Sequence, residues 1–447
     1  MRIKKIGIKN LFGIFHHGIP LNMKDRITII HGPNGYGKTV LLTMLNALFN
    51  ANYRAINSVP FTELSVEFED KSSLILKKRY KIETEGRNGT GLLFELTKGR
   101  SKPKTYLLEP RISQQEIRFP LSIIEKEIPT LDRIGSDTWI HIPTQEPLSL
   151  IEVLDRFGDR LPNVYHRIPR TGKEPDWLQK IRSSIHIRFI EAQRLYTFSK
   201  LRRPRDYEGM PPMVPSVNSY SEELANQIQA KLAEYATLSQ SLDRTFPTRL
   251  VKESSALAPT KEELRNNLGE LEEKRSRLMA AGLLDKEREI DFKDMQQIDE
   301  SNRNVLSVYI EDVKKKLSVL DELTNKIDLL VKIINNRFLY KKLSISKKDG
   351  FMFKSSEGKA ILPTKLSSGE QQELVLLYEL LFKVTPNSLI LIDEPELSLH
   401  VLWQQEFLKD LEDIIKIAGL DFLIATHSPQ IIHDRWDLAI ELKGPIK

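Results

Sequence analysis

The alternation of apolar and polar residues at the start of the chain predicts strands. Residues 2–10 place three isoleucines among lysine and asparagine, which is typical of a strand with one buried face. Residues 26–31 (RITIIH) are mostly apolar and predict a buried strand, and residues 40–49 (VLLTMLNALF) predict a helix with an apolar face. The glycine-rich segment GPNGYGKT joins these two elements. Strand, glycine-rich turn and helix in this order indicate the opening of a parallel α/β core.

The pattern then changes to short β-rich runs, which predict an antiparallel meander. The predicted strands are Leu64–Phe68, Leu74–Tyr80, Leu92–Leu96 and Thr105–Leu108. Asn88-Gly89 predicts the turn of a hairpin within this region. A further strand is predicted over residues 183–190 (SSIHIRFI).

A hydrophobic repeat of seven residues predicts helices over residues 220–338 in three stretches. The second stretch begins after Thr260, which forms a predicted capping box with Glu263. In the third stretch the apolar repeat runs from residue 306 to residue 334, and it predicts one helix of roughly 35 residues that extends beyond these positions and is about 50 Å long at 1.5 Å per residue.

The three helical stretches predict a short coiled-coil-like arm in which the helices fold back on one another. Breaks are predicted at Pro247 and Pro259, between the first two stretches. For the first stretch, an amphipathic helix packed on a globular core is an equally good interpretation. The length of the third helix favours an arm that projects.

The last part of the chain again predicts an α/β core. Residues 343–353 predict a small hairpin, and LSSGEQQ leads into a helix over residues 373–382. Apolar runs predict buried strands at 389–392 and 422–425. The first of these strands runs into DEPELSLH, and the second ends in Thr-His-Ser-Pro.

The segment GPNGYGKT fits the phosphate-binding pattern G-x-x-x-x-G-K-[ST], called a P-loop. Its glycines let backbone N–H groups turn toward phosphates, Lys38 reaches the β and γ oxygens, and the Thr39 hydroxyl ligates magnesium. The following helix adds the positive end of its dipole. The residues of this predicted site are Gly32, Pro33, Asn34, Gly35, Tyr36, Gly37, Lys38 and Thr39.

Two acidic residues, Asp393 and Glu394, follow the buried strand at 389–392. In the P-loop type of fold, the first acid lies near the magnesium ion, and the second orients the attacking water or accepts its proton. An apolar strand that ends in two acids is common by itself. Its combination with a P-loop in the same chain makes the functional interpretation the better one.

The composition narrows the chemistry further. The chain has 447 residues and no cysteine, which excludes disulfides, thiolate zinc sites, iron–sulfur clusters and a cysteine nucleophile. The net charge of +6 permits a nucleic-acid partner without requiring one. The apolar runs are too short to cross a bilayer and no signal peptide is predicted, so we expect a cytoplasmic protein with no membrane partner.

Basic residues cluster within residues 77–81, 98–104 and 188–205. Such clusters can bind a nucleic-acid backbone. Solvated faces, or a docking site for an acidic protein, are equally good interpretations.

The motifs together resemble those of ABC-type ATPases. LSSGEQQ is similar to the LSGGQ signature, DEPELSLH resembles a Walker B motif followed by the D-loop, and Thr426-His427 matches the switch histidine. The helical insertion between the two halves resembles the arrangement in SMC and RecF proteins. DEPE-x-x-LH with ATHSP resembles OLD-type proteins and the ATPase subunits of bacterial anti-phage systems, such as AriA of PARIS and PtuA of Septu.

This resemblance implies an α/β fold, the ABC/SMC-like ATPase head, which combines a P-loop parallel sheet with an antiparallel β subdomain and carries an inserted helical coiled-coil-like arm. Residues 1–215 would form the first half of the head, residues 216–340 the arm, and residues 341–447 the second half of the head.

The resemblance also implies a head-to-head dimer, or a higher homo-oligomer, with two ATP molecules and Mg²⁺ at the interface. Glu394 would be the catalytic base and His427 the sensor of the γ-phosphate, and Leu397–Leu399 would form the D-loop. The signature residues that would bind the γ-phosphate held by the opposite subunit are Ser367, Ser368, Gly369 and Glu370.

The glutamine that would sense magnesium has two candidates. Gln193 follows a predicted strand and precedes the arm, which is where the resemblance places it. Gln145 is the alternative. We favour Gln193, because Arg194 beside it could read a phosphate as well.

Three functions agree with these motifs. The first is an ATPase switch of an anti-phage defence complex that senses DNA or a phage protein and controls a separate effector. Only about 20 residues follow His427, which leaves no room there for a fused nuclease domain. We therefore expect the effector to be a separate protein, a nuclease. The second is a RecF/SMC-like ATPase of DNA repair or chromosome maintenance, and the third is a free-standing scaffold that binds and slowly hydrolyses ATP.

Overall fold

The structure is a computed structural model. It describes residues 1–84, 87–99, 101–108, 174–190, 195–198, 213–252, 259–285, 300–397 and 399–444, together with short segments between 121 and 157.

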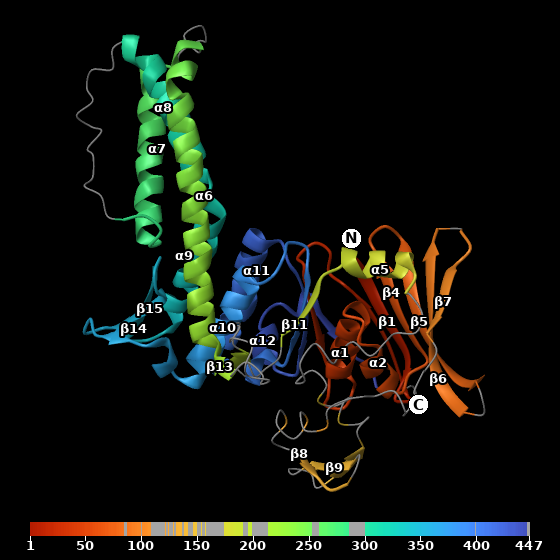
Figure 1. Ribbon diagram of the computed structural model, residues 1–447. Helices are drawn as coiled ribbons and strands as arrows, with labels where there is room; N and C mark the ends of the chain where they lie inside the picture. The colour runs from red at the N-terminus through yellow and green to blue at the C-terminus, as the bar shows by residue number, and fades with distance from the viewer. Residues whose placement is uncertain are drawn as a thin grey trace.

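A five-stranded parallel sheet lies at the centre of the molecule (Figure 1). Its strands, in spatial order, are β11 (Ile187–Ile190), β17 (Leu389–Asp393), β18 (Asp421–Thr426), β3 (Ile27–His31) and β19 (Ala439–Glu441). In the register, Asp393 lies opposite Ala425 and Thr426 opposite His31, so three strands end at the same edge. The three buried strands predicted from apolar runs are confirmed here.

A six-stranded antiparallel sheet packs beside the first sheet and confirms the predicted meander. Its strands, in spatial order, are β2 (Phe15–Pro20), β1 (Ile3–Leu11), β4 (Glu63–Phe68), β5 (Ser72–Thr84), β6 (Arg87–Lys98) and β7 (Lys104–Leu108). The helix α1 (Lys38–Phe49) shares one apolar core with this sheet and with one face of the parallel sheet, and α2 (Tyr53–Ser58) follows it.

Two local predictions in this half were wrong. Asn88 and Gly89 do not form a turn, because both pair with β5 inside the long strand β6. The strand predicted over 183–190 is shorter, since α5 (Asp176–Ser184) ends inside that range and β11 begins only at Ile187. The hydroxyl of Ser184 donates to the carbonyl of Ile181, as in a helix.

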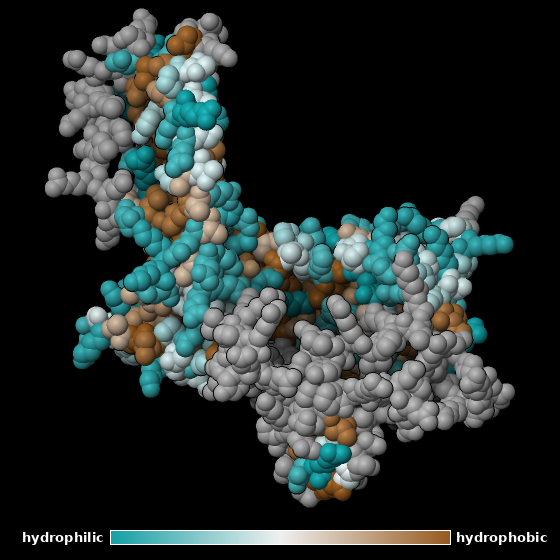
Figure 2. Space-filling model, in the orientation of Figure 1, coloured by the Kyte–Doolittle hydropathy of each residue, from teal (hydrophilic) through white to brown (hydrophobic). Residues whose placement is uncertain are grey.

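Four helices form the described part of the arm, which rises from one end of the head in Figure 1. They are α6 (Ser216–Lys252), α7 (Lys261–Ala280), α8 (Glu300–Ser318) and α9 (Asp321–Arg337). The capping box of Thr260 and Glu263 is confirmed at the start of α7. In Figure 2 the visible face of the arm carries hydrophilic residues with several apolar ones among them, whereas the leucines of the seven-residue repeat in α7 are buried.

The arm differs from its prediction at two points. Pro247 lies inside α6 and does not end it. Arg249, just beyond, binds Asp312 of α8 with an N–O distance of 2.6 Å, so a tertiary contact holds the helix beyond the proline. The single long helix predicted over 306–334 is in fact two helices, α8 and α9, which are interrupted at residues 319–320, where Leu320 is completely buried.

The remaining head elements cover the other face of the parallel sheet or lie at its margins. The predicted hairpin is confirmed as β14 (Lys341–Ser346) and β15 (Gly350–Ser355), with β16 (Ala360–Ile361) added. The helices α10 (Ser368–Phe382) and α11 (Val401–Ala418) pack with the arm base in a second apolar core. Shorter elements are β8 (Leu131–Arg133), β9 (Thr138–His141), β10 (Glu146–Ser149), β12 (Tyr196–Phe198), β13 (Met213–Pro215) and α12 (Pro429–Ile432).

These elements confirm the predicted fold class. The described chain has a P-loop parallel sheet, an antiparallel β subdomain and an inserted set of arm helices. Among the described residues, no helix combines the length and the hydropathy needed to cross a membrane.

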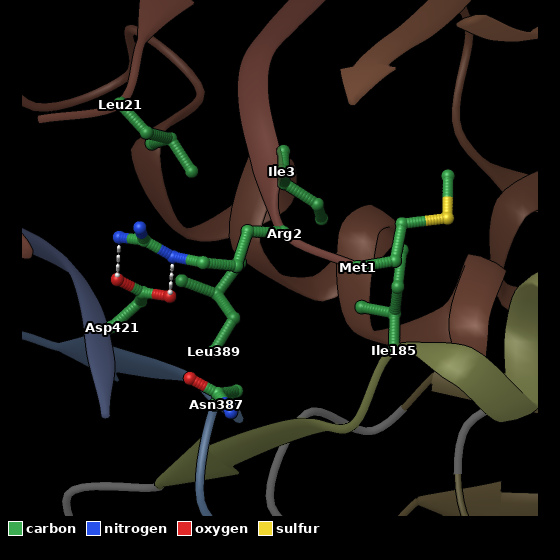
Figure 3. A pocket seen from close by; sticks show the side chains of 8 residues that line it. All are labelled: Met1, Arg2, Ile3, Leu21, Ile185, Asn387, Leu389 and Asp421. Atoms are coloured by element: carbon green, nitrogen blue, oxygen red, sulfur yellow. Dashed lines mark hydrogen bonds and ion pairs between the residues drawn. The ribbon is translucent and has the colours of Figure 1, made fainter. Parts of the chain in front are cut away.

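A small pocket at the amino ends of the parallel strands holds an ion pair (Figure 3). Arg2 donates from Nε to Asp421 Oδ2 at 2.9 Å and from Nη2 to Asp421 Oδ1 at 2.6 Å. This contact ties the start of β1 to the start of β18. The pocket lies at the end of the parallel strands opposite to the P-loop.

A buried charge cluster joins the arm to the head. Arg337, the last residue of α9, has a side chain that is 2% exposed and contacts Glu373 of α10 and Asp410 of α11. Its guanidinium also lies 6.0 Å from the centre of the Trp403 ring. Burial raises the pKa of Asp410 to about 6, even though the charge of Arg337 opposes the shift. One cation therefore holds three helices together.

Replacing Arg337 by methionine is expected to lower the free energy of unfolding by about 3–5 kcal/mol, because the buried carboxylate of Glu373 and the partly buried carboxylate of Asp410 lose their cation. Urea denaturation would measure this loss. The control is Arg435→Met, which breaks a more exposed pair with Glu412 and should cost less than about 1 kcal/mol. Equal losses in the two variants would show that the cluster does not stabilise the arm base.

Candidate nucleotide-binding site

The P-loop connects β3 to α1 at the edge where the parallel strands end. Gly37, just before the first turn of α1, has a φ of 83° and a ψ of 17°, a left-handed conformation that glycine adopts without strain. A Cβ atom at this position would lie 2.5 Å from Cδ2 of Leu11. The left-handed backbone therefore favours glycine here, and any other side chain would also require Leu11 to shift.

Lys38 is folded against the loop that it follows. Its side chain is buried, and Nζ donates to the carbonyl oxygens of Gly32 at 2.7 Å and Pro33 at 3.2 Å. These two carbonyls keep the ammonium group within the P-loop. The group is thus placed where the loop would receive phosphates.

Thr39 and Asp393 meet across the sheet, although 353 residues separate them in the sequence. The Thr39 hydroxyl lies close enough to the Asp393 carboxylate to act on its pKa. Burial raises the pKa of Asp393, while the Thr39 hydroxyl acts in the opposite direction. The Oδ1 atom of Asp393 is buried and has no hydrogen-bond partner among the described residues. A hydroxyl and a carboxylate with a free oxygen are suitable ligands for Mg²⁺, so these residues fit the predicted metal.

Glu394 and His427 lie side by side at the ends of β17 and β18. The backbone N–H of Glu394 donates to the carbonyl of Ala425 at 2.8 Å, which fixes the residue after the strand. Its Oε1 lies 3.5 Å from His427 Nδ1. The predicted base and the predicted phosphate sensor are therefore neighbours at the P-loop edge of the sheet.

Glu396 belongs to the same site, and the sequence analysis gave it no role. Its Oε1 accepts hydrogen bonds from Thr426 Oγ1 at 2.8 Å and from the backbone N–H of His427 at 3.1 Å. The same oxygen lies 3.2 Å from His427 Nδ1. The one signal that could have revealed it is a further acid in DEPE, two residues after Glu394.

The signature segment forms the start of α10. Ser367 is the N-cap residue, and its Oγ accepts a hydrogen bond from the Glu370 N–H at 3.3 Å. The Glu370 carboxylate turns back to accept from the Ser367 N–H at 2.8 Å and from Lys341 Nζ at 2.7 Å. Burial opposes the shift, but the bonds from Lys341 and Ser367 hold the pKa of Glu370 below its usual value.

The capping box leaves part of the signature segment accessible to solvent. Ser367 and Ser368 are exposed at the helix N-terminus, and a Cβ atom added at Gly369 would meet nothing within 4 Å. Glu370 is instead used to complete the capping box, with its charge balanced by Lys341. The N-terminus of α10 is thus open to an anion in spite of the acid beside it.

Several predicted residues receive no structural account. Gln193 and Gln145 both lie outside the described residues, as does Ser398 of the D-loop, whereas Leu397 is described and exposed. Among the described basic residues, Lys77 pairs with Glu95 at 2.6 Å and Arg188 with Glu379 at 3.1 Å. Part of the basic clusters is therefore neutralised within the chain.

Two family models match successive parts of the chain. Residues 1–151 match a family described as "AAA ATPase domain", and residues 215–433 match one described as "AAA domain, putative AbiEii toxin, Type IV TA system". The first match contains the P-loop, and the second contains Asp393, Glu394 and His427. A search of the curated proteins gave no match.

Solved structures of SMC head domains are similar to the chain at low identity. One, from Pyrococcus furiosus, has an extended coiled coil and is bound to the C-terminal domain of ScpA; its identity is 12%, its TM-score is 0.32, and 99% of this chain and 94% of that chain are covered. The SMC head domain from Thermotoga maritima has 11% identity and a TM-score of 0.33, with 100% of both chains covered. At such TM-scores the likeness carries no argument about function.

The conclusion therefore rests on the family models and on the geometry. The two matched regions meet at one edge of the parallel sheet, where the P-loop faces the acids at the end of β17. Over both regions the chain is similar to AAA domains, one of which is described as an ATPase domain, and this similarity supports ATPase activity.

Proposed function

We propose that this chain is the ATP-hydrolysing subunit of a bacterial anti-phage defence complex, in which head-to-head dimerisation on ATP controls a separate effector nuclease. The observation that carries the hydrolytic part is the contact of Thr39 with Asp393 beside the neighbouring pair Glu394 and His427. The defence part is supported by the resemblance of DEPELSLH and ATHSP to OLD-type and anti-phage ATPases. The family description that names an AbiEii toxin is compatible with it. DNA or a phage protein would be the trigger.

Each residue of the site has a role in this proposal. The P-loop N–H groups and Lys38 hold the phosphates. Mg²⁺, when bound, would neutralise charge on the β- and γ-phosphates, and Thr39 and Asp393 are the residues that would hold it. Glu394 accepts a proton from the attacking water, and His427 donates a hydrogen bond to an oxygen of the γ-phosphate.

The two cores of the head support a dimer. Along β17, Leu391 belongs to the core shared with α1, whereas Ile390 and Ile392 belong to the core shared with α10. The P-loop helix and the signature helix thus lie on opposite faces of one sheet. This favours contact of the exposed signature residues with a phosphate held by another subunit. We also propose that residues 1–215 form the first half of the head, residues 216–340 the arm, and residues 341–447 the second half of the head.

An exposed apolar group next to the site supports the same interface. Leu397, Val401 and Leu402 follow the acids of β17 and are 66%, 56% and 68% exposed. Apolar residues gathered at this degree of exposure are typical of surfaces that meet a partner. They lie on the D-loop and on the first turn of α11.

ATP is expected to double the mass of a Glu394→Gln variant of the full chain in light scattering after gel filtration. Adding Leu402→Asp should weaken this dimer by about 10-fold or more, because a charge would enter an apolar interface. Ile134→Asp changes an equally exposed residue elsewhere and serves as the control. A dimer that tolerates Leu402→Asp would contradict the proposed interface.

The defence role is tested by purifying the tagged chain from its host and identifying what accompanies it by mass spectrometry. A nuclease in near-stoichiometric amount is the expected result. Repair factors with DNA, together with DNA-stimulated hydrolysis that falls steeply with salt, would favour the RecF/SMC-like alternative instead.

A further inference from the structure

Glu396 carries more contacts than a structural cap of the turn needs. Its side chain is 7% exposed and sits in the short 3₁₀ helix Pro395–Leu397 that follows β17. One oxygen, Oε1, receives the Thr426 hydroxyl and the His427 N–H, and it also contacts the His427 ring. A backbone cap would require only the N–H contact. The contact to the imidazole also restrains the orientation of the histidine side chain.

The imidazole of His427 has little else to hold it. Its side chain is 45% exposed, and no hydrogen bond to Nε2 occurs among the described residues. A carboxylate can only accept hydrogen bonds, so the 3.2 Å contact between Nδ1 and Glu396 Oε1 is favourable only when Nδ1 carries a hydrogen. The second nitrogen, Nε2, is then left for a ligand. Glu396 thus fixes the side on which the ring can meet a nucleotide.

The same contact leaves the predicted base, Glu394, with the longer of two contacts to His427. Nδ1 lies 3.2 Å from Glu396 but 3.5 Å from Glu394, so the shorter contact belongs to the buried carboxylate. With Nδ1 engaged by Glu396, the Glu394 carboxylate keeps its capacity to accept a proton from water. Glu396 would therefore orient the His427 ring, while Glu394 would act on water.

We propose that Glu396 is a positioning residue for ATP hydrolysis, which holds the His427 ring through Nδ1, presents Nε2 to the γ-phosphate and leaves Glu394 free to act on water. This inference rests on the proposed hydrolytic function. Glu396 contacts neither the P-loop nor the Thr39–Asp393 pair in the hydrogen bonds that the structure describes. Its effect should therefore appear in the chemical step and not in ATP binding.

The test compares Glu396→Gln with wild type in the full chain. Glutamine has the same size and keeps an oxygen acceptor, but it loses the charge and can offer an amide donor to Nδ1. The expected result is a fall in kcat of about 10- to 100-fold with the affinity for ATP changed less than about 2-fold. Glu412→Gln, on the outside of α11, should leave both quantities unchanged. An unchanged kcat for Glu396→Gln would overturn the inference.

A double-mutant cycle tests whether Glu396 acts through the histidine. In a His427→Ala background, Glu396→Gln should have almost no further effect on kcat. An equal loss in both backgrounds would show that Glu396 acts by another route. The proposed function is tested by the wild-type chain alone. If wild type binds ATP without hydrolysing it, both the proposed function and this inference are wrong. If wild type hydrolyses ATP and Glu396→Gln does so equally fast, only this inference is wrong.

Discussion

Replacing Glu394 by glutamine is expected to slow ATP hydrolysis by about 100- to 10,000-fold, the usual contribution of a general base. The carboxylate lies at the end of β17, 3.5 Å from His427, and is the acid that can reach water beside the P-loop. Glutamine preserves the size and shape of the side chain, so ATP binding should remain. The variant should therefore accumulate the ATP-bound dimer.

Phosphate release and the binding of a fluorescent ATP analogue measure the two effects separately. Glu357→Gln is the matched control, since Glu357 is an exposed acid in the turn between β15 and β16. Near-normal hydrolysis by Glu394→Gln would show that another group accepts the proton from water.

Lys38→Ala is expected to lower the affinity for ATP by about 100-fold or more. Hydrogen bonds from charged groups contribute about 1.5–3 kcal/mol each, and the ammonium of Lys38 is held inside the P-loop where it can make more than one. Hydrolysis should be lost as a consequence. Isothermal titration with ATP and Mg²⁺ measures the affinity.

The control for this variant is Lys359→Ala, which removes an exposed lysine between β15 and β16 and should bind ATP normally. Circular dichroism checks that Lys38→Ala is folded. A folded variant that binds ATP as tightly as wild type would contradict the assignment of the P-loop.

The P-loop could be predicted because its residues are contiguous and their order encodes both the turn and the following helix. The closeness of Thr39 and Asp393 depends on β3 and β17, which lie in one sheet with β18 between them, and the general geometry of P-loop folds supplied that link. Glu396 was missed because its partners, Thr426 and His427, lie about 30 residues further on. Their proximity follows from the parallel pairing of β17 with β18, which no local pattern encodes.

The wrong predictions share one physical cause. Turn and break signals report local preference, whereas the length of an element is set by what it packs against. Asn88-Gly89 is a good turn sequence, but pairing with β5 continues as far as Thr84 and Arg87. Pro247 weakens one turn of α6, yet contacts with α8 continue beyond it.

The charge cluster of Arg337 has a mechanical consequence. It fastens the last turn of α9 to α10 and α11, and Lys341 fastens the next residues of the chain to the signature through Glu370. The arm base and the signature should therefore move together. In the proposed dimer, an ATP molecule would connect the signature and arm of one subunit to the P-loop of the other. The relative orientation of the two arms should then change when ATP is hydrolysed.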